Sequence, residues 1–449
     1  MEWKYDRNTL YALLEHKDYA GFRAKIKAEN EVNIAELIES LPLETAVAAF
    51  RTLPKGLAAD VFSNLSREAQ QGIITSISDG ELSNIIEDLY LDDAVDMLEE
   101  MPASVVKRVM QNACPQTRRM INQFLNYPVD SVGSIMTAEC IELKKAMSVS
   151  DAIAYIRANG RDSEQIYTCY VTGHSHILCG IVTLKELLLS SDDCLLETIM
   201  NSHVITAATT EDQEAAVQRM MKYDLLALPV VDQEKRLVGI VTVDDGMDVM
   251  QAEATEDFEK MAAIAPSERP YLKTGVFTLA KKRFLWLMIL MVSGMVTGGI
   301  LGKYELAFAA MPLLVTFIPM LTDTGGNAGS QSSTLVIRGI AVGEIKLKDF
   351  GCVLWKELRV SLLAGTGLAL VNFIRLMIQY PGNLLLALTV SLALLATVVI
   401  AKTVGGVLPL AAKALKVDPA IMAAPLITTI VDALSLLIYF TLVQTLLPI

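Results

Sequence analysis

Apolar and polar positions repeat with a step of 12 residues between positions 30 and 110. Each repeat opens with an apolar residue followed by a turn or cap residue: Leu41-Pro42, Leu53-Pro54, Leu65-Ser66, Ile77-Ser78, Leu89-Tyr90 and Met101-Pro102. A short amphipathic helix is predicted after each pair. Because such helices cannot bury an apolar face alone, the register favours a stacked helical superhelix over residues 1–130 rather than an ordinary bundle.

A second repeat occupies residues 131–245. Ser134–Thr137 recurs as Thr198–Asn201, and Cys179–Thr183 recurs as Val238–Thr242. An amphipathic helix and β-branched strands are predicted between these segments. The arrangement resembles a tandem pair of CBS domains, because two copies carry the same opening and closing motifs.

CBS pairs often bind adenine nucleotides through a G-x-x-T-x-x-D motif. The second copy matches that motif with Gly239, Thr242 and Asp245, whereas the first copy has Glu186 at the Asp position. The resemblance therefore implies an adenine-nucleotide site, for example for ATP, in one half only. The alternative that no nucleotide binds stays open.

Residues 246–270 are predicted to form an acidic linking helix. Acidic side chains are frequent from just before this helix to its middle: Asp244, Asp245, Asp248, Glu253, Glu256, Asp257 and Glu259. Apolar Met247, Val249, Met250 and Ala254 leave a helical stripe between them. Like charges at this density repel one another, and either a solvated face or a bound divalent ion would relieve the repulsion.

Residues 271–449 have the pattern of a membrane domain with five spans. We predict the spans at Phe284–Leu301, Leu306–Leu321, Val353–Met377, Leu384–Leu408 and Ile421–Leu446. The second span is the weakest because Pro312 and Pro319 interrupt it. Basic residues alternate between loops, which predicts a cytoplasmic N-terminus and a C-terminus outside.

Charge separates the two parts of the chain. From Tyr271 onward there are 14 Lys/Arg and 7 Asp/Glu, which leaves 24 basic and 44 acidic residues, a net of −20, for the preceding part. An acidic surface argues against nucleic acid as a partner and favours cations. The fold class is therefore a multidomain α + α/β membrane protein with a helical superhelix, a tandem CBS pair and a five-helix transmembrane domain.

Two polar features interrupt the apolar spans. Asp432 is the one charged residue between Ala420 and Ile449, and a carboxylate there costs roughly 2.5–3.5 kcal/mol or more. Thr428 and Ser435 extend a polar face along the same helix. After the second span, a glycine-rich segment offers neutral oxygens suited to a hydrated cation, and we select Gly325, Gly326, Asn327 and Gln331 from it as pore-lining residues. An ordinary turn is the alternative for this segment.

Together these features resemble the MgtE magnesium channel/transporter family over nearly the whole length. The match includes the segments Gly-Gly-Asn-x-Gly-x-Gln and Asp-Pro-Ala…Pro-Leu-Ile-Thr-Thr-x-x-Asp, in that order. The resemblance implies a homodimer in the lipid bilayer, with a pore between subunits lined mainly by the second and fifth spans. It implies that Asp432 holds hydrated Mg²⁺. It further implies a bacterial or archaeal inner (plasma) membrane and no enzymatic activity.

The resemblance also implies a cytosolic Mg²⁺ sensor that closes the pore when Mg²⁺ is plentiful. Its acids would be Asp60, Asp92, Asp96, Asp212, Asp224, Asp245, Asp248, Glu253, Glu256, Asp257 and Asp418. Asp245 thus belongs both to this implied sensor and to the nucleotide motif.

Three other functions compete with Mg²⁺ transport. Transport of Co²⁺ or Mn²⁺ has little support, since Cys352 is the one Cys or His of the membrane domain. An intramembrane aspartyl protease would use Asp323 with Asp432, but the Gly-x-Gly-Asp pattern of such enzymes is absent. A membrane-anchored nucleotide sensor would leave the charge in the last span unexplained.

Overall fold

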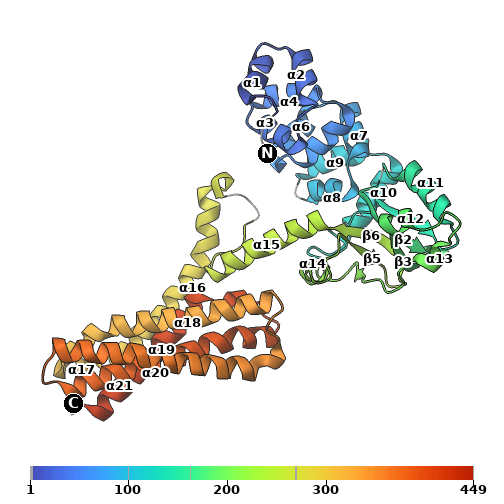
Figure 1. Cartoon of the computed structure of the whole chain (residues 1–449). Coiled ribbons are helices and arrows are strands. Elements are labelled where there is room, and N and C mark those ends of the chain that lie inside the picture. The colour runs from blue at the N-terminus through green and yellow to red at the C-terminus, as the bar shows by residue number, and fades with distance from the viewer. Residues whose placement is uncertain (1–3, 100, 162, 268–270, 448–449) are drawn as a thin grey trace. The chain divides into compact units, whose positions relative to one another are not determined.

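The chain divides into two units, Met1–Met250 and Gln251–Ile449 (Figure 1). The computed structural model describes residues 4–99, 101–161, 163–267 and 271–447.

The first unit opens with ten short helices. They are α1 (Arg7–Glu15), α2 (Tyr19–Ile26), α3 (Glu31–Glu39), α4 (Leu43–Arg51), α5 (Lys55–Ser63), α6 (Arg67–Ser76), α7 (Asp79–Asp88), α8 (Leu91–Glu99), α9 (Ala103–Asn112) and α10 (Pro115–Phe124). Helices α4 to α9 each begin directly after a predicted marker pair, which confirms the 12-residue repeat. The apolar members Leu53, Leu65 and Ile77 are buried, and Ser78 closes a capping box at the start of α7.

The second half of this unit contains two three-stranded sheets. Its elements are β1 (Cys140–Lys144), α11 (Val149–Asn159), β2 (Gln165–Thr172), η1 (His174–His176), β3 (Leu178–Thr183), α12 (Leu184–Leu189), α13 (Leu196–Ile199), β4 (Ala207–Ala208), α14 (Gln213–Lys222), β5 (Ala227–Val231), β6 (Leu237–Thr242) and α15 (Val243–Met261). In each sheet the first strand pairs in parallel with the second, and the second pairs antiparallel with the third. One buried core continues from the helical repeat into the second sheet, including Leu98, Val109, Met136 and Leu228.

The two sheets exchange their opening segments. Thr137, ahead of β1, pairs with Ile240 of β6, while Asn201 pairs with Ile181 of β3. Both pairings are made of two backbone hydrogen bonds of 2.8–3.0 Å. A side chain at Gly239 would collide with the Thr137 carbonyl, which explains the glycine in the repeated motif.

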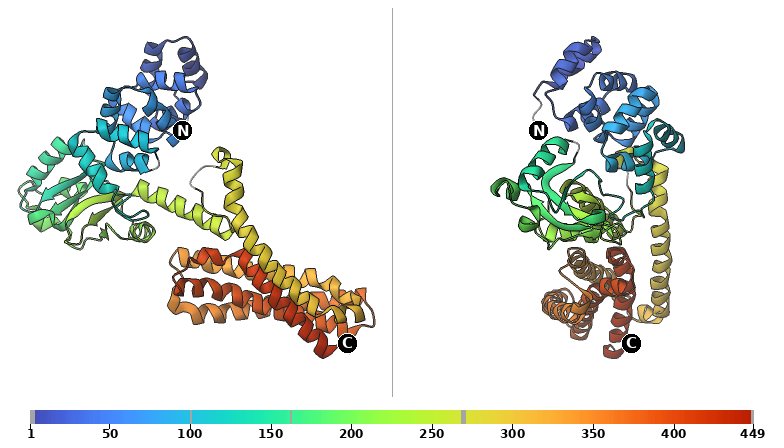
Figure 2. Two further views of the ribbon diagram at one scale, coloured as in Figure 1. Left: turned by 180° about the vertical axis from the view of Figure 1, so that it is seen from behind. Right: turned by 90° about the vertical axis from the view of Figure 1, so that its right-hand side faces the viewer.

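The second unit is helical. It consists of the last part of α15 followed by η2 (Tyr271–Lys273), α16 (Val276–Lys303), α17 (Glu305–Ala310), η3 (Pro312–Phe317), α18 (Ile318–Ala341), η4 (Leu347–Asp349), α19 (Phe350–Gln379), α20 (Leu384–Ala414), η5 (Pro419–Met422) and α21 (Ala424–Leu446). Helix α20 packs against α18, α19 and α21 and lies at the centre of the bundle, seen from two further sides in Figure 2. Helix α16 packs mainly on α21 and has no buried residue among those described.

Four helical segments of the described chain are long and apolar enough to cross a membrane: Val276–Lys303, Leu347–Gln379, Leu384–Ala414 and Pro419–Leu446. They correspond to the first, third, fourth and fifth predicted spans. The second differs, since residues 306–321 are divided among α17, η3 and the first turn of α18. The total of five spans stays a prediction, whereas the three-part fold class is confirmed.

The glycine-rich segment lies inside α18 and is not a turn after a span. Gly325, Gly326 and Gly329 are buried, and side chains at these positions would meet Thr428, Val431 or Ile427 of α21. Across the other side, a side chain at Gly405 of α20 would collide with the Gly329 backbone. Small residues let membrane helices approach closely, and this packing offsets the low helix propensity of glycine.

Candidate functional site

An acidic cluster forms in the first unit where α8 lies near the start of α15. Asp92 and Asp93 occupy the first turn of α8, where the helix dipole favours negative charge. Their charges repel those of Asp245, at the start of α15, and Glu164, just before β2. Asp92 Oδ1 and Glu164 Oε2 are buried and accept no hydrogen bond from any described residue.

Burial and mutual repulsion shift these acids far from their ordinary titration range. Burial first, and then Asp245, Asp93 and Glu164, raise the pKa of Asp92 to about 9. Burial and the same neighbourhood raise the pKa of Glu164 to about 8. The pKa values of Asp93 and Asp245 rise to about 6, again mainly through burial. Asp92 and Glu164 therefore hold protons at neutral pH in the absence of a cation.

The chemistry of this donor set suits a hard divalent cation. Carboxylate oxygens are the ligands that Mg²⁺ and Ca²⁺ prefer, and the two buried oxygens without partners offer lone pairs to such an ion. Within the described residues, no three acidic, His or Cys side chains converge closely enough to hold a metal. Cation binding at this cluster would therefore require the carboxylates to turn toward one another.

The structure brings only part of the predicted sensor set to this cluster. Asp96 of α8 has Arg67 and Asp248 as charged neighbours. Asp60 is exposed on α5 but close enough to influence Asp93. Two further predicted residues, Asp212 and Asp224, have local structural roles.

Those two residues lie at opposite ends of α14. The Asp212 carboxylate caps the helix by accepting a 3.0 Å hydrogen bond from the Ala215 N–H. Asp224 follows the helix in a left-handed conformation with a φ of 51°. Both positions have the features of a cap and a turn.

A second group of acids lies in the second unit, at the end of α15. The Lys260 ammonium group lies 2.5 Å from Glu256 and 2.6 Å from Asp418, which caps η5 just before α21. Asp418 also contributes, after burial, to a raised pKa for the half-buried Asp257. Predicted Glu253 lies one turn earlier on the same helix. A lysine thus joins the linking helix to the loop that precedes the last membrane helix.

The proposed nucleotide motif has a structural role in both CBS copies. Thr242, at the end of β6, donates a short hydrogen bond to the Asp245 carboxylate at the start of α15. In the first copy Thr183 donates to Glu186 over 2.8 Å, and this pair forms a capping box for α12. The Thr and acid of the motif therefore organise a helix start, whether or not a nucleotide binds there.

Helix α18 presents a polar stripe on the surface of the second unit. Asp323, Asn327 and Gln331 follow one another at intervals of four residues, and all three are exposed. The Asn327 amide donates a 3.3 Å hydrogen bond to the Asp323 carboxylate. Asp432 of α21 is half-buried and lies close enough to Asp323 for the two carboxylates to interact electrostatically. Two carboxylates thus lie near one another on helices of an apolar bundle.

Other predicted pore residues have different positions. Gly325 and Gly326 are buried beneath α21 and serve helix packing, as described above. Ser435 is also buried, next to Gly325, and its hydroxyl has no described hydrogen-bond partner. The half-buried Thr428 donates a 3.0 Å hydrogen bond to the Pro425 carbonyl of its own helix. Of the predicted set, Asn327, Gln331 and Asp432 are therefore the polar groups best placed to meet an ion.

Sequence reasoning missed Asp93, Glu164 and Lys260, and it weighed Asp323 only as a protease residue. Reading 318–341 as a helix would have placed Asp323 one turn from Asn327. Glu164 carries no sequence signal, because only the fold brings the start of β2 to α8.

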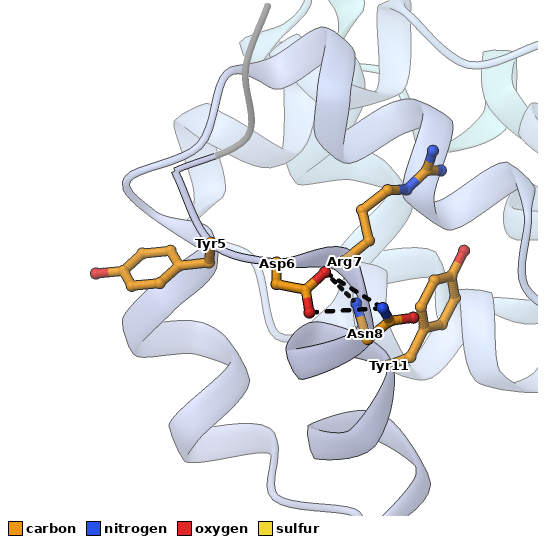
Figure 3. Close-up of a pocket in the computed structure, with 5 residues that line it drawn as sticks. All are labelled: Tyr5, Asp6, Arg7, Asn8 and Tyr11. Carbon is orange, nitrogen blue, oxygen red and sulfur yellow. Dashed lines mark hydrogen bonds between the residues drawn. The ribbon is translucent and has the colours of Figure 1, made fainter.

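A hollow beside α1 is lined by Tyr5, Asp6, Arg7, Asn8 and Tyr11 (Figure 3). The Asp6 carboxylate accepts hydrogen bonds from the backbone and side-chain N–H groups of Asn8, at 3.2 and 3.4 Å. These bonds cap α1, so we assign the hollow a structural role.

Three family models match the chain. Residues 318–442 match a divalent cation transporter model, residues 29–130 match the MgtE intracellular N domain, and residues 132–193 and 196–252 each match a CBS domain. Among solved structures, the cytosolic domain of the Mg²⁺ channel MgtE in complex with ATP is similar at 33% identity and a TM-score of 0.52. It covers 54% of this chain and 100% of that one. The soluble part of a magnesium transporter is similar at 27% identity and a TM-score of 0.53, covering 55% and 98%.

Curated relatives extend the similarity to the full length. The magnesium transporter MgtE of Thermus thermophilus is 35% identical over 98% of both chains. The magnesium transporter MgtE of Bacillus subtilis is 31% identical over 95% of this chain and 94% of that one. With the membrane helices, the CBS pair and the helical repeat all in place, the chain belongs to the MgtE family of magnesium transporters and is a multi-pass membrane protein that transports Mg²⁺.

Proposed function

We propose that the protein takes up Mg²⁺ through a pore at the interface of a homodimer, with α18 and α21 lining the pore. The observation that carries this proposal is the polar stripe of α18 beside Asp432, exposed on the surface of an otherwise apolar unit. Exposed polar groups on a membrane helix need a wet surface or a partner. A second copy related by two-fold symmetry would enclose the stripe and place two copies of Asp432 around the ion path.

In this arrangement Mg²⁺ keeps most of its water, because it dehydrates reluctantly. The carboxylates of Asp432 and Asp323 attract the hydrated ion, and the Asn327 amide hydrogen-bonds to the carboxylate or to the water. The cytoplasm holds the N-terminal unit, and the C-terminus lies outside. An inside-negative potential then favours entry by about 2.3 kcal/mol per charge per 100 mV.

The test of this pore is Mg²⁺ uptake into proteoliposomes loaded with a fluorescent Mg²⁺ indicator. Asp432→Asn should reduce uptake at least tenfold, whereas Glu344→Gln, at an exposed carboxylate of the loop after α18, should leave it unchanged. Wild-type uptake by Asp432→Asn would refute the pore.

Cross-linking tests the dimer. With the six native cysteines replaced, a single cysteine at Asn327 should form a disulfide between copies, while one at the exposed Leu370 of α19 should not. Failure of the Asn327 variant to cross-link in membranes, under oxidation that cross-links a known dimer, would refute a pore on the two-fold axis.

The acidic cluster and the linking helix would close this pore when cytosolic Mg²⁺ is high. Ions that neutralise Asp92, Glu164 and Asp245 would hold α8 against the start of α15, and α15 continues as one helix to the Lys260 contact. Loss of the ions removes the bridges between α8 and the start of α15, Asp92 and Glu164 take up protons, and separation becomes more favourable, which is a shift between two populations. A tenfold change in opening needs only about 1.4 kcal/mol of coupling.

ATP is a second proposed ligand, for the CBS pair. The solved cytosolic domain of a related Mg²⁺ channel is in complex with ATP, and this chain keeps Gly239, Thr242 and Asp245 in its second copy. Thr242→Ala should weaken ATP binding in equilibrium dialysis at least tenfold, with Thr183→Ala in the first copy as the matched control. Equal ATP binding by all three proteins would refute this site.

A further inference from the structure

One buried charge in the membrane unit has no place in the function described so far. Lys402 lies in the middle of α20 and is 8% exposed. Lysine inside a membrane helix is costly unless it faces polar groups within the protein. Its surroundings therefore indicate what it does.

The Lys402 ammonium group contacts two consecutive residues of α18. It donates to the Gln331 side-chain oxygen at 3.4 Å and to the Ser332 hydroxyl at 3.5 Å. The buried Ser332 hydroxyl in turn donates to the Glu357 carboxylate of α19 at 2.6 Å. The Ser332 hydroxyl can accept a hydrogen bond from Lys402 and donate one to Glu357 at the same time, so both contacts can form together. A positive and a negative group are thus joined through one serine, and three helices are joined with them.

Glu357 is held in place by packing as well as by this hydrogen bond. A side chain at Gly406 of α20 would meet the Glu357 Cγ at 2.9 Å, so the glycine leaves room for the glutamate stem. Glu357 and Lys402 therefore compensate each other's charge inside the bundle, where a single unpaired charge would be expensive.

The contact with Gln331 has a direct consequence for the polar stripe. An ammonium group only donates hydrogen bonds, so the amide atom that faces it is the oxygen. Gln331 must then direct its NH₂ group elsewhere. The Gln331 oxygen is therefore a weaker cation ligand than the other polar groups of the stripe, because Lys402 occupies one of its two lone pairs and adds a positive charge beside it, whereas the amide oxygen of Asn327, one turn earlier, has no such constraint from Lys402.

We propose that Lys402 is a positioning residue that sets how strongly the transport path holds Mg²⁺. It fixes the Gln331 amide with its oxygen turned inward and, through Ser332 and Glu357, ties α18 to α19 and α20. The path then binds the cation strongly near Asp323 and Asp432 and more weakly at Gln331, where the ion can leave. This proposal rests on the proposed function, in which α18 lines the path.

The experiment measures initial rates of Mg²⁺ uptake by the full-length protein in proteoliposomes as a function of Mg²⁺ concentration. Lys402→Met alone leaves Glu357 without a counter-charge and should lower the yield of folded protein. The double variant Lys402→Met/Glu357→Gln removes both charges and should recover monodisperse, thermally stable protein. With the Gln331 oxygen released, its half-saturating Mg²⁺ concentration should fall at least threefold, and its maximal rate should fall because the ion leaves more slowly. Lys402→Arg keeps a donor and should keep the wild-type half-saturation.

Gln331→Leu separates positioning from simple packing. In this background the charge-removing double substitution should no longer change half-saturation, since the amide on which Lys402 acts is gone. Two results would overturn the proposal: a stable double variant with the wild-type half-saturation, or the same shift with and without Gln331. Failure of the pore itself is detected separately, by wild-type uptake in Asp432→Asn.

Discussion

The raised pKa values of the acidic cluster predict that Mg²⁺ binding at this proposed sensor competes with proton binding. With pKa values of about 9 for Asp92 and about 8 for Glu164, about 1% and about 9% of these groups are ionised at pH 7. If Mg²⁺ binds the ionised forms, deprotonating Asp92 at pH 7 costs about 2.7 kcal/mol. Below pH 8, the apparent affinity for Mg²⁺ should therefore increase with pH. The increase should be about tenfold per pH unit for each of the two acids that must lose its proton.

The same shifts determine how pH affects the Mg²⁺-free fold. The folded chain holds these protons more tightly than the unfolded chain, whose Asp ionises near pH 3.9. The protonated cluster is therefore tolerated at low pH, and stability declines as the pH rises from about 4 toward about 9. Added Mg²⁺ should restore the stability lost at the alkaline end, because it binds the ionised form.

Asp92→Asn is the decisive variant, because it removes one titrating group and keeps the shape of the side chain. Mg²⁺ is added to full-length protein in weak buffer, and proton release is read with an indicator dye at pH 6.5, 7.5 and 8.5. The wild type should release one to two protons per bound ion at pH 7.5. Asp92→Asn should release about one fewer, and Asp88→Asn, at an exposed acid of α7, should match the wild type. Equal release by the wild type and Asp92→Asn would refute the assignment.

Further predictions concern helix contacts. Lys260→Met removes the cation between two carboxylates. In this variant, protection of the linking helix from limited proteolysis should depend more steeply on Mg²⁺ concentration and should be more complete. Lys281→Met, at an exposed lysine, is the control, and identical protection curves for the two variants would contradict this role of Lys260. Gly405→Val should destabilise the bundle by about 1–3 kcal/mol through overlap with α18, measured by thermal unfolding in detergent. Gly367→Ala has open space around it and should be neutral, so equal melting of the two variants would argue against close packing.

Local repeats made much of the fold predictable. In pairs such as Leu53-Pro54 and Ile77-Ser78, the first residue is buried and the second precedes a helix. Neighbouring residues therefore determine where each helix of the 12-residue repeat begins. The recurring CBS motifs likewise predicted two equivalent sheets.

The membrane motif was harder to predict because its stability is not local. Gly325, Gly326 and Gly329 disfavour a helix by their own propensity, and only close contact with α20 and α21 makes α18 continuous. For the same reason Lys402 was overlooked, since its partners on α18 lie about 70 residues away in sequence. Spacing along one helix cannot reveal such a contact.

The exchanged pairings of Thr137 with Ile240 and of Asn201 with Ile181 have a consequence for how this part of the molecule can be altered. Each CBS copy completes its sheet with backbone from the other, so a single copy expressed alone would expose an unpaired strand edge. The pair should therefore behave as one cooperative folding domain, in which a destabilising substitution in either copy destabilises both. Deleting, transplanting or duplicating a single copy would yield an aggregation-prone fragment, and only the complete pair is an exchangeable module.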